Sequence, residues 1–93
     1  MTKIYINDTG SSIILETGLV LTGALSLKIA VRKPDMTEIE WPAIIHGDTA
    51  VKYITVDGDL NMPGIWTLHS NVEMSDGEWL GESVSFEVFR KFN

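Results

Sequence analysis

The two histidines are the side chains of this chain best suited to acid–base chemistry, because imidazole by default titrates near neutral pH. A hydrolase would place His46 or His69 beside a nucleophile and an orienting carboxylate, and neither stands in such a sequence context. His69 also falls on the polar face of a predicted strand. We therefore interpret both as ordinary surface or sheet histidines.

Carboxylates gather around the last predicted turn, where a pair facing each other across a cleft could hydrolyse a glycosidic bond. They are Glu73, Asp76, Glu78 and Glu82. The predicted loops are short, so we expect no deep cleft and interpret these acids as a solvated hairpin that favours solubility. The sequence thus predicts that the protein is not an enzyme.

Oxygen-bearing side chains alternate at Asp57, Asp59 and Asn61, as they do at the start of a calcium loop. The helix-flanked loop also requires glycine at its sixth position and glutamate at its twelfth, where this chain has Met62 and Leu68. We interpret the cluster as a turn in which Asx side chains bond backbone amides. A looser calcium site at the end of a sandwich is the alternative, and otherwise we expect no metal and no cofactor.

The three tryptophans, Trp41, Trp66 and Trp79, would form a sugar-stacking platform if their rings shared one exposed sheet face. Trp66 shares its face with Leu68 and Val72, which predicts a core position. Trp41 and Trp79 lie near predicted hairpin ends, and we expect them to be partly exposed. A small carbohydrate-binding module that holds a surface glycan is therefore the alternative function.

Size and charge limit the class of protein. The 93 residues are expected to form a single domain, residues 1–93. The net charge of −6 repels phosphate backbones, so nucleic acid is not an expected partner. No segment has the ~20 apolar residues of a membrane helix, and the N-terminus has no hydrophobic leader. The absence of cysteine excludes disulfides and thiolate zinc sites.

Alternation of apolar and polar residues with period two predicts an all-β fold, because helical periodicity is absent. Two long closing strands joined by a turn at Ser75-Asp76-Gly77, with Trp66 buried, are typical of an immunoglobulin-like antiparallel β-sandwich of seven to nine short strands. Pro42 should end its strand or lie at a sheet edge. The predicted strands cover residues 4–6, 12–17, 19–21, 25–32, 38–41, 49–56, 66–73 and 83–88.

The three clearest alternations also predict which side chains face the core. One apolar face belongs to each of the strands at residues 25–32, 66–73 and 83–88. The predicted core residues are Leu27, Ile29, Val31, Trp66, Leu68, Val72, Val84, Phe86 and Val88.

The turn and core motifs follow one another in a specific order from about Ile4 to Val88. A Leu-Thr-Gly-Ala turn at residues 21–24 introduces a strand that ends in Arg-Lys-Pro-Asp at residues 32–35. The order continues with Glu38-x-x-Trp41-Pro42, Asp59-Leu60, Pro63-Gly64-x-Trp66-x-Leu68, Gly77-x-Trp79 and Val84-x-Phe86-x-Val88. It resembles a family of immunoglobulin-like phage domains, similar to the N-terminal domain of phage baseplate upper proteins. The chain departs from the pattern at Met36, where the family usually has glycine, so we expect a longer or slightly strained hairpin there.

The resemblance implies a virion structural protein or adaptor in a tail, baseplate or neck, or one that decorates a capsid. It implies no catalytic residues. The expected partners are other virion proteins and copies of this chain, and the expected location is the virion, after synthesis in the host cytoplasm. Because the chain starts at Met1 and ends just beyond the last predicted strand, we expect a stand-alone gene product.

Apolar residues at three places predict the docking surface. They lie on a terminal strand whose edge could pair with a partner, on a triplet of which one face should be exposed, and at the C-terminal end. In that order they are Ile4 and Ile6; Ile13, Ile14 and Leu15; and Phe89 and Phe92.

Overall fold

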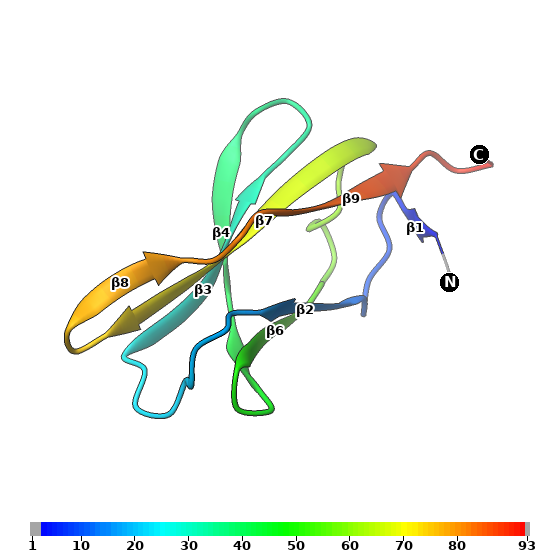
Figure 1. Cartoon of the computed structure of the whole chain (residues 1–93). Helices are drawn as coiled ribbons and strands as arrows, with labels where there is room; N and C mark the ends of the chain where they lie inside the picture. The colour runs from blue at the N-terminus through cyan, green and yellow to red at the C-terminus, as the bar shows by residue number, and fades with distance from the viewer. Residues whose placement is uncertain (1–2, 93) are drawn as a thin grey trace.

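The computed structural model describes residues 3–92, and within them the secondary structure consists of β-strands without any helix (Figure 1). The all-β class predicted from the alternation is therefore confirmed. The strands are β1 (Ile4–Tyr5), β2 (Ser12–Glu16), β3 (Ser26–Arg32), β4 (Glu38–Pro42), β5 (Ile44–His46), β6 (Ala50–Ile54), β7 (Gly64–Met74), β8 (Gly77–Leu80) and β9 (Val84–Phe89).

The strands form two sheets. Sheet A has the order β1-β9-β7-β3-β4, and β8 also pairs with β7; sheet B has the order β2-β6-β5. All pairs are antiparallel except β1 with β9, in which Ile4 lies opposite Val88 and Tyr5 opposite Phe89. The prediction of a purely antiparallel sandwich is wrong at this one pair, because the N-terminal strand runs beside the C-terminal strand in the same direction.

Pro42 marks the point where the chain leaves sheet A for sheet B. It is the last residue of β4, which is the edge strand of sheet A, and β5 of sheet B begins two residues later. A proline has no N–H to give to a neighbouring strand, so it is suited to this position. Both expectations for Pro42 are thus confirmed.

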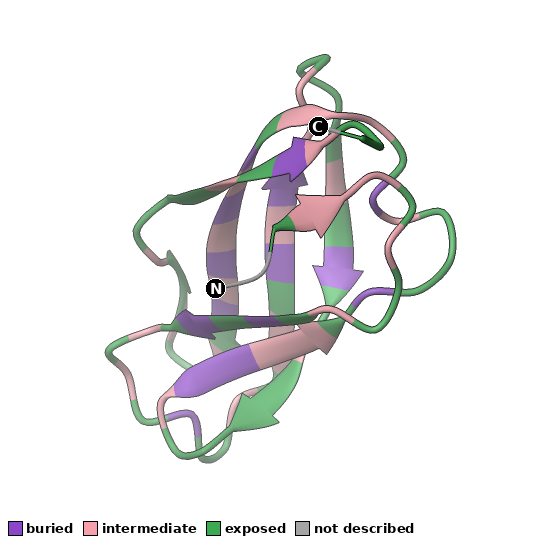
Figure 2. Ribbon diagram, turned by 90° about the vertical axis from the view of Figure 1, so that its right-hand side faces the viewer, coloured by how far each residue is buried: buried purple, intermediate pink, exposed green. Residues whose placement is uncertain are grey.

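Both sheets contribute buried residues to one core, an arrangement consistent with a β-sandwich (Figure 2). Four aromatic rings run through it in sequence: Tyr53 stacks on Trp41 with centroids 4.8 Å apart, Trp41 lies 6.2 Å from Trp66, and Trp66 lies 6.3 Å from Phe86. The Trp66 indole N–H donates to the backbone carbonyl of Met62 at 3.1 Å, so its polar atom is satisfied. This column links β6 of sheet B to three strands of sheet A.

The core prediction is confirmed for most residues and wrong for Val84, which is 46% exposed. Leu27 and Phe86 are partly buried, and the others are buried. Sheet A has more strands than sheet B, so the inner face of its outer strand β9 is incompletely covered at its start. Trp41 is only 3% exposed, against expectation, because its pairing with Ile29 places it on the inner face of β4.

Two strand predictions also need correction. Residues 19–21 form a loop instead of a strand, although Leu21 is fully buried. The single strand predicted to return from the turn at Ser75-Asp76-Gly77 is divided into β8 and β9. The short strand β5 was not predicted, because its three exposed residues carry no visible alternation.

Candidate functional site

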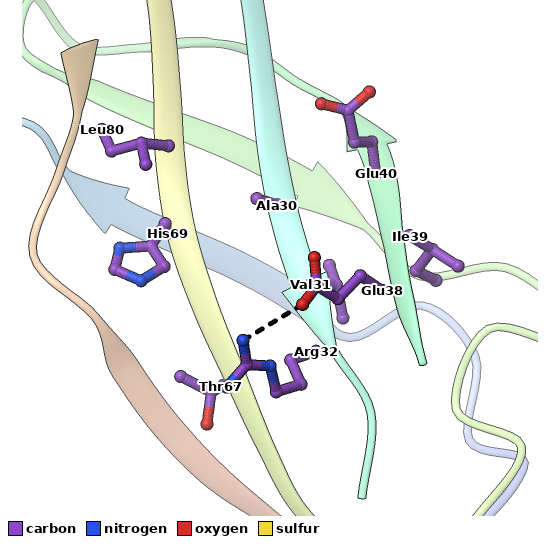
Figure 3. Close-up of a pocket in the computed structure, with 9 residues that line it drawn as sticks. All are labelled: Ala30, Val31, Arg32, Glu38, Ile39, Glu40, Thr67, His69 and Leu80. Carbon is purple, nitrogen blue, oxygen red and sulfur yellow. Dashed lines mark hydrogen bonds and ion pairs between the residues drawn. The ribbon is translucent and has the colours of Figure 1, made fainter. Parts of the chain in front are cut away.

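A shallow trough of about 640 Å³ runs along the outer face of sheet A (Figure 3). Its floor is Ala30, whose methyl group leaves space between His69 on β7 and Glu40 on β4, the residues directly opposite it on the two neighbouring strands. Leu80 of β8 closes one side, and the pair Arg32–Glu38 closes one end. The trough thus results from one small residue in a row of larger ones.

His69 is fixed in this trough by a backbone contact. Its Nδ1 lies 2.7 Å from the carbonyl oxygen of Gly81, and since a carbonyl only accepts, Nδ1 carries the proton. Because Nδ1 bonds a carbonyl and not a carboxylate, and no hydroxyl hydrogen bond to the ring is found within residues 3–92, His69 lacks the partners of a general base. His46 is exposed at the end of β5.

Each of the three charged residues that line the trough is in an ion pair, and Lys28, the partner of Glu40, lies outside the lining. Arg32 Nη2 lies 3.1 Å from Glu38 Oε2, and Lys28 Nζ lies 3.7 Å from Glu40 Oε1. All four side chains are between 49% and 68% exposed, so each pair contributes little to stability. The pairs neutralise the rim of the trough and leave it without a strong field for a charged ligand.

The turn at Asp57, Asp59 and Asn61 is built around Asp59. Its Oδ2 accepts hydrogen bonds from the hydroxyl of Tyr53 at 2.6 Å and from the backbone N–H of Val56 at 2.8 Å. Burial, together with this hydrogen bond and the charge of Asp59, raises the pKa of Tyr53 to about 12. The interpretation of Asp59 as a residue that bonds a backbone amide is confirmed.

The other two oxygen-bearing side chains of that turn do not join Asp59. Asn61 Oδ1 accepts from Lys33 Nζ at 3.4 Å, and Asp57 is exposed. Among residues 3–92, no three His, Cys, Asp or Glu side chains gather closely enough to hold a metal ion.

The tryptophans do not share an exposed face. Trp41 and Trp66 are in the core, and of the three only Trp79 is substantially exposed, with its ring over Gly77. No second tryptophan ring lies beside it to form a stacking platform.

The apolar triplet on β2 divides into two sets. Ile13 and Leu15 are buried in the core, so the prediction that they belong to a docking surface is wrong; alternation along β2 turns both inward. Ile14 points outward and is 46% exposed, as expected for one face of the triplet.

The terminal strand offers less to a partner than the sequence suggested. Ile4 and Ile6 are partly buried and pack against the core. The outward backbone groups of β1 belong to Tyr5, whose N–H donates to Asp8 Oδ2 at 2.9 Å and whose carbonyl accepts from Asp8 N–H at 3.1 Å. The edge of β1 is therefore closed at Tyr5, which argues against the predicted strand pairing there.

The two predicted C-terminal phenylalanines differ in their surroundings. Phe89 is partly buried, with the Tyr5 ring 6.3 Å away and Lys3 Nζ 4.7 Å from its centroid. Phe92 is 94% exposed. Of the C-terminal pair, Phe92 is therefore the one that is free to contact a partner.

An exposed apolar patch that the sequence reading did not predict lies on the outer face of sheet B. Ile14, Lys52 and Ile44 form one row across β2, β6 and β5, and Ile54 lies two residues after Lys52 on β6. We call these four residues the sheet B patch; all three isoleucines are exposed. In the sequence, only the alternation along β2 indicates that Ile14 is exposed. The pairing of the strands then places Ile44 and Ile54 on the same face as Ile14.

The fold and its surface thus define an all-β protein with two sheets around one core and apolar groups on the smaller sheet. Within the described residues there is no helix that is long and apolar enough to cross a membrane. Comparison with known proteins finds no matching family model, no matching curated protein and no matching solved structure.

Proposed function

We propose that this chain is a non-enzymatic structural or adaptor protein of a bacteriophage particle that acts by protein–protein docking. The observation that carries the docking role is the sheet B patch, in which Ile14, Ile44 and Ile54 are 46%, 65% and 48% exposed on one sheet face. Exposed apolar side chains that gather on one sheet face of a small protein are typical of a contact site. The phage setting is supported by the family resemblance of the turn and core motifs.

The strand order supports the immunoglobulin-like assignment on which that resemblance depends. In variable-type immunoglobulin domains, one sheet contains strands G, F, C and C′ as neighbours and the other contains B, E and D. Here β9-β7-β3-β4 and β2-β6-β5 correspond to those two sets, and β1 runs beside β9. Two of the motifs behind the resemblance lie at a turn and at a strand start of this arrangement: Lys33-Pro34-Asp35 lies in the hairpin between β3 and β4, and Gly64 begins β7.

The chemistry of the trough favours docking over catalysis. His69 is bonded to a backbone carbonyl, and each charged side chain that lines the trough is in an ion pair. The alternative function, a small carbohydrate-binding module, would use this trough. None of its lining residues is Trp, Tyr or Phe, so a sugar ring would lack the usual stacking partner there.

The proposal is tested by whether the protein is found, at a counted stoichiometry, in purified phage particles. Ile44→Asp places a charge in the sheet B patch, and Leu80→Asp is its matched control, since Ile44 and Leu80 are 65% and 63% exposed on opposite sheets. We expect the wild type and Leu80→Asp to be incorporated and Ile44→Asp to be lost, with both variants folded by circular dichroism.

Absence of the wild type from particles, or normal incorporation of Ile44→Asp, would contradict the proposal. Binding to a glycan array that is abolished by Leu80→Asp but kept by Ile44→Asp would favour the carbohydrate-binding alternative.

A further inference from the structure

The edges of the two sheets are protected to very different degrees. At the two ends of the β3–β4 ladder, Lys33 N–H donates to Thr37 O and Ala43 N–H donates to Leu27 O. Alternate residues of β4 therefore bond β3, and the residues between them, Glu38, Glu40 and Pro42, direct their backbone groups outward. Two carboxylates and a residue without N–H discourage any further strand. On the opposite side of sheet A, the outward positions of β8 include Glu78, and β1 covers the end of β9. The edge of β1 is closed at Tyr5 by Asp8.

The edge of β2 has fewer of these protections, with one carboxylate, Glu16, and no proline. Thr55 N–H donates to Ser11 O, and Thr17 N–H donates to Thr49 O, so alternate residues of β2 bond β6. The residues between them, Ser12, Ile14 and Glu16, direct their N–H and C=O groups away from the sheet. Their side chains are exposed, and no strand within residues 3–92 pairs with this edge. A five-residue strand with isoleucine at its centre is a template for strand addition.

We propose that β2 pairs with β2 of a second copy of this chain, antiparallel and about a two-fold axis at Ile14. In that register the outward N–H and C=O of Ile14 meet those of Ile14 in the second copy. Ser12 lies opposite Glu16 of the second copy, and Glu16 lies opposite its Ser12. Every outward donor therefore finds an acceptor, and sheet B becomes a continuous sheet of six strands.

The side chains of this register are complementary as well. A hydroxyl faces each carboxylate, so no two like charges lie directly opposite each other, which would be unfavourable in a sheet. The row Ile44–Lys52–Ile14 of one copy continues into the same row of the second copy, which covers part of the sheet B patch. The same symmetric pairing at β4 would place Glu40 against Glu40. The edge of β2 is thus self-complementary where the edge of β4 is not.

The proposed pairing makes a second copy of this chain one partner of the docking surface, and it therefore rests on the proposed docking function. One short strand and a few exposed side chains make a contact smaller than about 1,200 Å², which is the range of weak and transient association. We therefore expect a dimer with Kd of roughly tens to hundreds of micromolar. An assembly that displays many copies side by side would strengthen such a weak contact through effective concentration.

Charge substitutions at position 12 test the register, because this exposed residue faces Glu16 of the second copy in the proposed dimer. Sedimentation velocity is measured from about 10 µM to about 1 mM, a range chosen to bracket the expected Kd. Ser12→Glu should weaken the dimer about ten-fold and Ser12→Lys should tighten it by a similar factor, because each change acts at two symmetric cross-strand pairs. The double variant Ser12→Glu with Glu16→Lys should restore dimerisation.

Ser85→Glu and Ser85→Lys are matched controls, since Ser85 is an exposed serine on β9 of sheet A and the changes in net charge are the same. Neither should alter the Kd. A wild type that stays monomeric at about 1 mM, well above the expected Kd, or a dimer that responds equally to the changes at positions 12 and 85, would overturn the proposed pairing.

Particle incorporation separates this inference from the proposed function. A protein that dimerises through β2 but is absent from particles contradicts the proposed function and leaves the pairing intact. A protein that is incorporated but monomeric at every concentration overturns the pairing and leaves the docking role intact.

Discussion

Met36 is the position where a single substitution should make this protein more stable. It is the last residue of the hairpin loop between β3 and β4, in which Met36 N–H donates to Lys33 O at 2.9 Å and Lys33 N–H donates to Thr37 O at 2.9 Å. Such a three-residue loop requires a left-handed residue at its end, for which glycine is preferred. Met36 occupies that conformation with φ of 72°, so the strain expected from the sequence is present.

The expected gain follows from two opposing effects. A side chain in the left-handed region costs roughly 1–2 kcal/mol, and Met36→Gly removes this cost. Glycine also gives the unfolded chain more freedom, which costs about 0.4–1 kcal/mol. The Met36 side chain is 69% exposed, so little buried area is lost. The net effect should be a stabilisation of about 0.5–1 kcal/mol, or a rise in Tm of about 2–8 °C for a domain of this size.

Urea unfolding followed by tryptophan fluorescence measures this difference, because two of the three tryptophans are buried. Met36→Ala is the control: it removes the same exposed side chain but keeps the Cβ atom, so its stability should stay within about 0.5 kcal/mol of the wild type. Met36→Asn should fall between the two, since asparagine tolerates positive φ. If Met36→Gly were no more stable than Met36→Ala, backbone strain at this position would be refuted.

Two further predictions concern the aromatic column. Trp66→Ala should cost about 3–5 kcal/mol, a large share of the ~5–15 kcal/mol of a typical domain; a loss below ~1 kcal/mol in urea unfolding would contradict its core role. Since the pKa of Tyr53 is about 12 when folded and 10.0 ordinarily, the unfolded state ionises first, and stability should fall as pH rises from 10.0 towards 12. Asp59→Asn should lower the Tyr53 pKa, measured by ultraviolet titration of the phenol; an unchanged pKa would show that the Asp59 contact contributes nothing.

Alternation along a strand indicates which residues share a face but not how far the opposite sheet extends. It correctly placed Ile29, Leu68 and Val88 in the core. It failed at Val84, which has the right parity but lies where the three strands of sheet B do not cover sheet A. The parallel pairing of β1 with β9 joins residues 4–5 to residues 88–89, and no local pattern carries information on such a long-range contact.

The candidate docking residues show the same limit. Parity along the predicted strand at residues 12–17 indicated that only one face of the triplet is exposed, and that face proves to be Ile14, with Ile13 and Leu15 buried. The role of Asp59 was predictable, because Asx turns depend on neighbouring residues. The sheet B patch was not, since Ile44 joins Ile14 only through the register of both with β6.

The other edges of the two sheets explain why self-pairing through β2 would stop at two copies. The other edge of sheet B is β5, a strand of three residues that pairs with β6 through Ile44 and His46, so only Ile45 directs its backbone groups outward. One residue is too short a template for a stable strand pair. Glutamates occupy the long edges of sheet A, where addition of a strand would bring carboxylates together. With one open edge for each copy, a two-fold contact consumes that edge on both partners, and the net charge of −6 on each copy opposes any less specific association.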